Sequence, residues 1–336
     1  MNPIIGITMH PSEGRQQINN SYIESIIQAG GIPLCIPIIQ QLLLQGHFII
    51  IATENEGKAL LEKEFPNLPI ITLKGYDISY SKTNSQVWKI ISQIPKILYR
   101  IKKEHSSLKK IIAQHQITTV ISDNRFGLWS SKVHCIYITH QLRIMMPKWL
   151  KPMEFVAEWI HRTIINRYDE CWIPDFAGEN NLSGELSHRN KMPQNAKFIG
   201  ILSRFENINI KPETTKKFHT VAIVSGVEPQ RTLFLKKITS SLLLSNEKSL
   251  IIGGTPSKTE TFTNKNITFV NHLSSEEFAN ILYHAKRIIC RSGYSTMMDL
   301  ETLKKSAEII ATPGQTEQEY LAKYLIKKGK HQLWKE

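Results

Sequence analysis

The strongest local signal in the chain is the stretch CRSGYSTMMDLETLKKSAEIIATPGQTEQEYLA at residues 290–322. An apolar strand predicted to end at Cys290 is followed by Arg291, Ser292 and Gly293, and a helix is predicted to begin directly after this glycine. The first backbone N–H groups of a helix have no partner within it, and they carry the positive end of the helix dipole. The stretch therefore predicts a strand–turn–helix unit that binds a phosphate, with Arg291 as a cation for the same group.

Further polar side chains follow this turn. Thr296 lies in the first turn of the predicted helix, and Asp299 one turn later is placed to accept hydrogen bonds from ribose hydroxyls. The next predicted strand runs into a Pro-Gly turn, after which Gln315 and Gln318 offer amides to sugar hydroxyls. The alternative is that Thr296 only caps a helix and that residues 313–314 form an ordinary loop.

Two other turns in the same half have the same character. Ser225 and Gly226 end a predicted strand and precede Arg231 at the start of an apolar helix. Gly253 and Gly254 end the next strand. Glycine-bearing turns between a strand and a helix suit a diphosphate, because the backbone can approach it closely. One such turn is weak evidence, so the prediction depends on several occurring together.

Short apolar runs alternate with amphipathic stretches along the whole chain. The predicted strands cover residues 4–8, 48–52, 69–73, 118–122, 135–139, 170–173, 221–225, 249–253, 267–270, 287–290 and 308–311. Continuously apolar strands separated by helices are typical of parallel βαβ units covered on both faces. The pattern predicts an α/β protein made of two doubly wound, Rossmann-like domains.

A domain boundary is predicted in the second half of the chain. Residues 203–219 are polar, contain Pro212 and precede a new strand, so we expect domains at 1–203 and 219–336 with a linker at 204–218. A length of 336 residues is ample for two such domains.

The charge balance points to anionic partners. Lysine and arginine number 42 against 29 aspartates and glutamates, a net charge of +13. Basic residues concentrate in an amphipathic helix predicted over 87–114, which Pro95 should kink or divide. This helix either lies on an anionic membrane or simply covers a sheet, and we favour the second interpretation. No nucleic-acid-binding motif is present, so nucleic acid is not an expected partner.

The cysteines and the start of the chain indicate the compartment. No CxxC pair occurs among the four cysteines, and the apolar residues around them predict that their thiols are buried. They are Cys35, Cys135, Cys171 and Cys290. The first residues are not a signal peptide, and no apolar run approaches the roughly 20 residues of a membrane helix. We therefore expect a cytoplasmic protein, with the inner face of the membrane as a possible place of action.

Together these motifs resemble family 28 glycosyltransferases, the group that includes the N-acetylglucosaminyltransferase that makes lipid II. The similar segments are RSGYSTMMDL, IATPGQTEQEYLA, SGVEPQRT, NLSGELSH, ISDNR and ITHQL, within roughly residues 35–330. The most similar members are uncharacterised bacterial proteins. The resemblance implies a GT-B fold, in which two Rossmann-like domains face each other across a cleft.

The resemblance also implies an activity. Such enzymes transfer a sugar from a nucleotide diphosphate, here most simply a UDP-linked donor with N-acetylglucosamine as a candidate sugar, to a hydroxyl acceptor with inversion. They need no metal or other cofactor. The implied donor-binding residues are Ser225, Gly226, Arg231, Gly253, Gly254, Arg291, Ser292, Gly293, Thr296, Asp299, Gln315 and Gln318. Positive dipoles and side chains would stabilise the leaving diphosphate.

The first domain would hold the acceptor, a glycan or a lipid-linked molecule. Asp123, Asn124 and Arg125 end one predicted strand, and His140 ends the next. Asp123 or His140 is the candidate base for the acceptor hydroxyl, with Asn124 and Arg125 as acceptor contacts. The alternative is that Asp123 caps a helix and that His140 satisfies neighbouring backbone groups.

The two ends of the chain depart from the family pattern. Related transferases have a glycine-rich loop with a histidine where this chain has residues 27–34, and they continue with a helix beyond the segment HQLWKE. Residues 2–39 instead resemble the start of class I glutamine amidotransferase-like hydrolases, which cleave γ-glutamyl amides. Two alternatives follow: a catalytically inactive protein that binds nucleotide sugar or glycan, and a γ-glutamyl amidohydrolase. The second lacks a cysteine in a nucleophile elbow.

Overall fold

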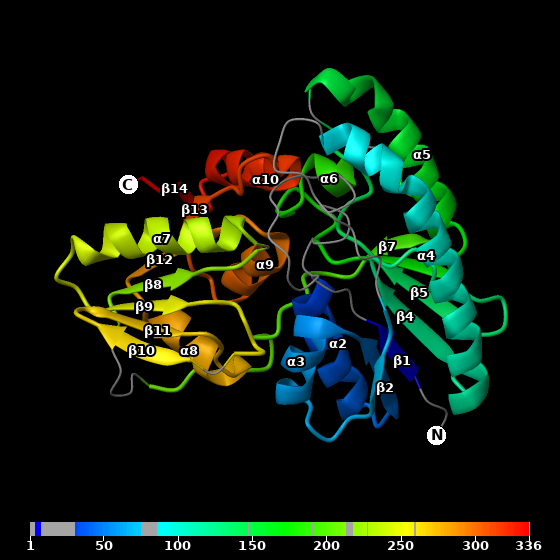
Figure 1. Cartoon of the computed structure of the whole chain (residues 1–336), viewed down its shortest axis with the longest axis horizontal. Coiled ribbons are helices and arrows are strands. Elements are labelled where there is room, and N and C mark those ends of the chain that lie inside the picture. Colours follow the sequence, from blue (N-terminus) through cyan, green and yellow to red (C-terminus); the bar gives the residue numbers. More distant parts are fainter. Residues whose placement is uncertain are drawn as a thin grey trace.

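The protein consists of two α/β halves, each built on a seven-stranded sheet (Figure 1). The computed structural model describes residues 4–7, 31–74, 86–146, 148–189, 191–212, 218–226, 228–258 and 260–335. The first sheet contains the strands up to β7 (Ala196–Phe198), and the second begins at β8 (Thr220–Ile223). The chain therefore passes once from one half to the other, between these two strands.

The first sheet is parallel throughout and has the strand order β3-β2-β1-β4-β5-β6-β7. Its other strands are β1 (Ile4–Ile7), β2 (Ile49–Thr53), β3 (Ile70–Thr72), β4 (Thr119–Asp123), β5 (His134–Ile138) and β6 (Glu170–Ile173). The helices of this half are α2 (Gly31–Leu44), α3 (Asn55–Glu64), α4 (Gln86–His115), α5 (Glu154–Ile165) and the short α6 (Glu185–His188), with a 3-10 turn at Lys148–Met153. All five residues of β2 are buried, as expected for a strand covered on both faces.

The second sheet has the order β10-β11-β9-β8-β12-β13-β14. Its other strands are β9 (Ser249–Ile252), β10 (Thr261–Asn264), β11 (Ile267–Val270), β12 (Arg287–Arg291), β13 (Glu308–Ile310) and β14 (Gln332–Leu333), and its helices are α7 (Gln230–Leu243), α8 (Ser275–His284), α9 (Tyr294–Thr302) and α10 (Thr316–Lys327). Strand β10 pairs antiparallel with β11, and the other pairings are parallel. In Figure 1, α9 lies between the two sheets, and α10 lies next to α6.

Every strand predicted from apolar runs occurs within two residues of its predicted ends. The edge strands β10 and β14 were missed because their residues are all exposed and neither strand has a continuous apolar run. The prediction that Pro95 could divide its helix is wrong, because α4 continues through it. One proline removes a single backbone hydrogen bond, and a 30-residue helix keeps the bonds on either side.

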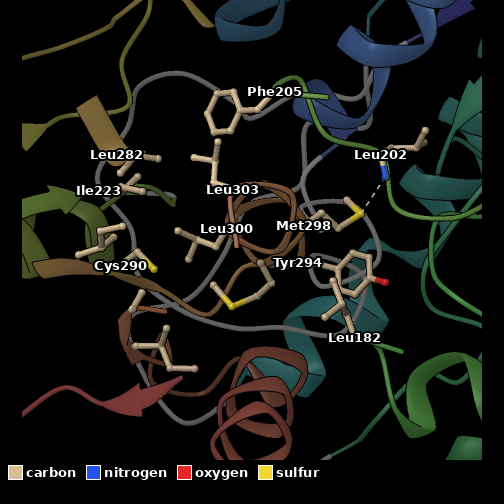
Figure 2. Packing of buried hydrophobic residues seen from close by; sticks show 14 of the residues in the cluster. Leu182, Leu202, Phe205, Ile223, Leu282, Cys290, Tyr294, Met298, Leu300 and Leu303 are labelled. Atoms are coloured by element: carbon tan, nitrogen blue, oxygen red, sulfur yellow. Dashed lines mark hydrogen bonds between the residues drawn. The ribbon is translucent and has the colours of Figure 1, made fainter. Parts of the chain in front are cut away.

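The two halves share one apolar core. Leu182 and Leu202 from the first half pack with Tyr294 and Met298 of α9, and Figure 2 shows this cluster. Phe205, which the sequence assigns to a polar linker, is only 2% exposed and belongs to the same cluster. Burial of this apolar surface holds the halves together, so the first part of the predicted linker is a packed segment.

Candidate functional site

The first two glycine-bearing turns of the second half are joined by an arginine. Ser225 and Gly226 follow β8, and Gly226 has a positive φ of 109° that suits glycine. Arg231, in the first turn of α7, donates a hydrogen bond to the carbonyl oxygen of Gly253 over 2.9 Å and another to Thr255 Oγ1 over 3.2 Å. Arg231 also forms an ion pair with Glu228, just after the first turn, so Ser225, Gly226, Arg231 and Gly253 lie in one group at the carboxyl edge of the sheet.

The turn after β9 can only be made by glycine. Gly254 has a φ of 63°, and a Cβ at this position would lie 2.6 Å from the carbonyl oxygen of Val224. A Cβ on Gly253 would lie 2.6 Å from the ring of Phe269. Gly254 thus allows the backbone after β9 to lie against the backbone that follows β8, and Gly253 makes room for the ring of Phe269.

Arg291 is a buried cation at the end of β12. Its guanidinium donates to the carbonyl oxygen of Ala311 over 2.6 Å and lies 4.1 Å from the ring centre of Phe234. Burial lowers the pKa of Arg291 to about 10, and within the described ranges no carboxylate pairs with it. A buried charge is costly unless it is paired, so this arginine would gain from an anionic ligand.

Helix α9 begins at Tyr294, three residues after this arginine. Gly293 precedes its first residue, and the first amide hydrogen bonded back into the helix is that of Met297, which donates to the Gly293 carbonyl oxygen over 3.1 Å. The amides ahead of it, including that of Thr296, have no intrahelical acceptor. Ser292 is fully buried and donates to the carbonyl oxygen of Gln318 over 2.8 Å, which ties the start of α9 to α10.

The two glutamines lie at the next strand end. Gln315 immediately precedes α10 and is 9% exposed. Gln318 accepts a hydrogen bond from the amide of Thr312 through Oε1 over 2.9 Å. This bond closes the turn after β13, so in this structure the Gln318 side-chain oxygen shapes the turn.

Asp299 is not brought to this group. Its carboxylate accepts hydrogen bonds from Ser203 Oγ over 2.7 Å and from Arg204 Nε over 3.2 Å. Burial raises the pKa of Asp299, while the Arg204 guanidinium favours its charged form. The side chain therefore anchors the segment that connects the two halves, a role that its position in the helix did not indicate.

On the first half, Asp123 stands at the end of β4 and is 1% exposed. The thiol of Cys35 on α2 approaches Asp123 Oδ2 at 3.6 Å, and Oδ1 is buried with no hydrogen-bond partner in the described part of the chain. Burial raises the pKa of Asp123 well above its ordinary value. Asn124 follows with a φ of 53° and accepts a hydrogen bond from Tyr137 Oη over 2.7 Å.

The other two predicted acceptor-side residues have partners of their own. Arg125 forms a buried ion pair with Glu104 of α4 at 2.5 Å and donates to the carbonyl oxygen of Lys74 over 2.9 Å. His140 Nε2 lies 2.9 Å from Glu317 Oε1 of α10. Arg125 therefore points into the fold of the first half, and His140 into the contact between the halves.

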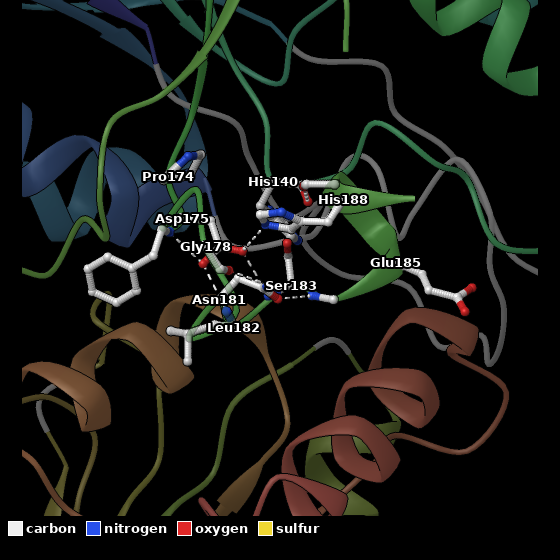
Figure 3. A network of polar contacts seen from close by, with 12 residues as sticks. His140, Pro174, Asp175, Gly178, Asn181, Leu182, Ser183, Glu185 and His188 are labelled. Carbon is white, nitrogen blue, oxygen red and sulfur yellow. Dashed lines mark hydrogen bonds and ion pairs between the residues drawn. The ribbon is translucent and has the colours of Figure 1, made fainter. Parts of the chain in front are cut away.

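Sequence reasoning missed Asp175, a fully buried carboxylate just after β6 (Figure 3). It accepts hydrogen bonds from the amides of Phe176, Leu182 and Ser183 over 2.8–2.9 Å and lies 3.2 Å from His188 Nε2. It thereby shapes the NLSGELSH segment at residues 181–188. The signal was available, because an aspartate follows this strand by two residues, much as Asp123 ends β4.

The cysteines do not present a nucleophile. All four are buried, and burial raises the pKa of Cys135 to about 11 and that of Cys171 and Cys290 to about 12, with Cys35 raised as well. The thiolate is the reactive form, so these side chains are poor nucleophiles at neutral pH.

The departure at residues 27–34 and the hydrolase-like start fall largely outside the described residues. Within the described ranges, no three His, Cys, Asp or Glu side chains are grouped to hold a metal ion.

No family model and no curated protein matches this sequence, but solved structures match the whole fold. The glycotransferase of kitacinnamycin has a TM-score of 0.61 at 12% identity, covering 99% of this chain and 86% of the other. MurG of Acinetobacter baumannii has a TM-score of 0.54 at 13% identity, covering 99% and 85%. A putative UDP-N-acetylglucosamine 2-epimerase of Listeria monocytogenes has a TM-score of 0.50 at 12% identity, covering 98% and 83%.

These likenesses show the fold. The chain has the GT-B fold of glycosyltransferases, as the motifs predicted, and the match extends over nearly all of its residues. Among proteins with this fold, MurG is a transferase similar to family 28, the family that the motifs resemble. The match to a putative epimerase means that the fold alone does not decide which reaction takes place.

Proposed function

We propose that this chain is a glycosyltransferase that moves a sugar from a UDP-linked donor to a hydroxyl acceptor with inversion. The observation that carries the proposal is the carboxyl edge of the second sheet. There the glycine turns joined by Arg231, the start of α9 and the buried cation of Arg291 come from neighbouring strands β9, β8 and β12. Ligands of parallel α/β sheets bind at this edge, and this combination suits a diphosphate.

The proposed chemistry uses one displacement. The acceptor oxygen attacks the anomeric carbon as the bond to the diphosphate oxygen breaks, which inverts that carbon. Asp123 takes the acceptor proton, and its raised pKa makes it a stronger base once ionised than an exposed aspartate. Arg291 and the amides at the start of α9 stabilise the charge that develops on UDP. N-acetylglucosamine is the sugar we propose to test first.

The donor side is tested by replacing Arg291. We expect Arg291→Ala to weaken UDP binding by about 10- to 100-fold, because a charge-assisted contact to phosphate is lost. Isothermal titration with UDP measures this, with Arg291→Gln as a second variant of similar size. The matched control is Arg287→Ala at the other end of β12, whose guanidinium pairs with Glu308 at 2.6 Å and should leave UDP affinity unchanged. Absence of UDP binding by the wild type overturns the proposal.

A lipid-linked acceptor is favoured by the surface of the first half. Phe155 and Trp159 on α5 are 71% and 68% exposed, and Leu98 and Tyr99 on α4 are 61% and 63% exposed. Both helices pack on the same core cluster of this half. On α4, basic residues at positions 96, 100, 102 and 103 are close to Leu98 and Tyr99 in the sequence. Exposed aromatic residues with basic neighbours suit the interface of an anionic membrane. The structure contains no described helix that is long and apolar enough to cross a membrane.

Membrane contact is tested by sedimentation with vesicles that contain phosphatidylserine. We expect the wild type to sediment and the double variant Phe155→Ser, Trp159→Ser to lose about tenfold or more in affinity, because two aromatic side chains no longer leave water. Leu244→Ser is the control, since Leu244 is 90% exposed but lies in the second half. If the double variant sediments as well as the Leu244→Ser control, α5 is not part of the membrane-binding surface.

A catalytically inactive nucleotide-sugar-binding protein is the second candidate. It is favoured by His140, one of the two candidate bases, whose ring nitrogen is held by Glu317. Donor affinity, donor hydrolysis and sugar transfer measured in one preparation separate the two functions, because the inactive protein binds the donor without consuming it. The third candidate is a γ-glutamyl amidohydrolase, which would need a reactive cysteine. The raised pKa values of the buried thiols argue against this function.

A further inference from the structure

The two halves touch on two flanks that differ in burial. On one flank, Lys63 of α3 donates to the carbonyl oxygen of Pro256 over 2.5 Å, and Glu56 accepts from the amide of Ser257 over 3.1 Å. These two contacts are exposed, and a third on this flank, from Ser275 Oγ to Glu64 Oε1 over 2.9 Å, is partly buried. On the other flank, the contacts between α9, α10 and the first half are buried within the shared core. Exposed hydrogen bonds cost little to open, so the buried flank is the one that fixes the relative position of the halves.

Tyr294 is the centre of the buried flank. It is the first residue of α9 and is 1% exposed. Its ring stacks on that of His140 from the first half, with ring centres 4.1 Å apart and planes within 3°. Its hydroxyl donates to the carbonyl oxygen of Pro174, also in the first half, over 2.9 Å. One side chain therefore contacts the loops that follow both β5 and β6.

His140 is itself held on three sides. Besides the stack on Tyr294, its Nε2 lies 2.9 Å from Glu317 Oε1, and its carbonyl oxygen accepts from Ser187 Oγ over 2.5 Å. Both His140 and Glu317 are buried, at 2% and 5% exposure. The imidazole thus has a defined orientation and presents a rigid face to Tyr294.

We propose that Tyr294 is a positioning residue that fixes the start of α9 against the carboxyl edge of the first sheet. The inference rests on the proposed function, because it assumes that the donor diphosphate binds at the start of α9 and that the acceptor binds beside Asp123. Tyr294 immediately follows Gly293, so its contacts with His140 and Pro174 set where the donor turn stands relative to the acceptor half.

This arrangement separates binding from turnover. The proposed donor contacts all belong to the second half, so loosening the Tyr294 contact leaves them in place. The distance between donor and acceptor depends on how the two halves are held, and a misplacement of about 1 Å can cost about a hundredfold in rate. The proposal therefore predicts a loss in kcat with little change in UDP affinity.

The first test uses two variants of Tyr294. We expect Tyr294→Leu, which removes the stack and the hydroxyl, to lower kcat by about tenfold to a hundredfold while UDP affinity by titration changes less than about threefold. Tyr294→Phe keeps the stack and should recover most of kcat. By small-angle scattering, Tyr294→Leu should have a larger radius of gyration than the wild type, whereas Tyr294→Phe and Glu56→Ala should not. Glu56→Ala, which removes a contact on the exposed flank, is the matched control and should leave kcat within about twofold.

The second test approaches the same contact from the other half. Should Tyr294→Leu fail to fold, His140→Gln removes the stack without changing α9. A positioning role predicts a lower kcat with an unchanged shape of the pH–rate profile, whereas loss of a base would remove its acid limb. An unaltered kcat in both variants, with UDP still bound, overturns the positioning role alone. Absence of UDP binding in the wild type overturns the proposed function instead.

Discussion

Asp123→Asn is expected to lower kcat for sugar transfer by about 100- to 10,000-fold, the usual contribution of a general base. Asparagine has nearly the same shape but cannot take the acceptor proton, and UDP affinity should stay unchanged because the proposed donor contacts lie in the other half. Steady-state transfer and UDP titration on the same sample measure both. Asp169→Asn is the control, since Asp169 lies before β6 at the opposite edge of the sheet. A variant that keeps its kcat would exclude Asp123 as the base.

The raised pKa of Asp123 also predicts how stability depends on pH. An unfolded aspartate has a pKa near 3.9, and burial raises the folded value well above this. The stability contributed by the protonated carboxyl is therefore fully present below about pH 3.9 and is lost as pH rises through the raised folded pKa. Asp123→Asn should unfold at a higher temperature than the wild type at pH 8, and the two should converge near pH 4. Equal midpoints at pH 8 would contradict this sign.

Glu104→Ala is expected to destabilise the protein by about 3–5 kcal/mol, because it removes the carboxylate that pairs with the buried guanidinium of Arg125. Both side chains of the pair are 1% exposed, and Glu104 also accepts from the amide of Gly127 over 2.9 Å. Urea unfolding measures the free energy of unfolding. Replacing both partners, as in Glu104→Met with Arg125→Met, should recover much of the loss, since no unpaired charge then remains.

The control for this prediction is a pair of the same kind on the surface. Lys58 and Glu62 on α3 are 3.7 Å apart, with side chains 37% and 54% exposed. Breaking it by Glu62→Ala should cost less than about 1 kcal/mol, because water solvates the charge that remains. A loss for Glu104→Ala as small as for Glu62→Ala would mean that Arg125 finds another partner or reaches solvent.

Local sequence was enough for most of the fold and for part of the candidate site. The strands were predictable because a strand buried on both faces must be apolar along its length, and this shows in any short window. The turns at Gly226 and Gly254 were predictable because each needs a positive φ, which glycine adopts without strain. Strand β10 was missed because an exposed edge strand needs no apolar residues.

Side chains whose role depends on a distant partner were not predictable. Asp299 has the position of a ribose ligand within its helix, yet its carboxylate is held by Ser203 and Arg204, which lie 96 and 95 residues earlier. Arg125 follows Asp123 by two residues but points to Glu104. A short stretch of sequence does not determine which distant residue will contact such a side chain in the folded protein.

The sequence alone therefore determined the α/β class, the positions of the apolar strands and the glycine turns at Gly226 and Gly254, because each depends on residues close together in the chain. Only the tertiary structure decided that Arg291 is buried without an acidic partner in the described ranges, and that Tyr294 and His140 join the halves. Burial and pairing depend on how distant segments pack together. This packing has a larger effect on the free energy of a buried charge or ring than the residues next to it in the sequence have.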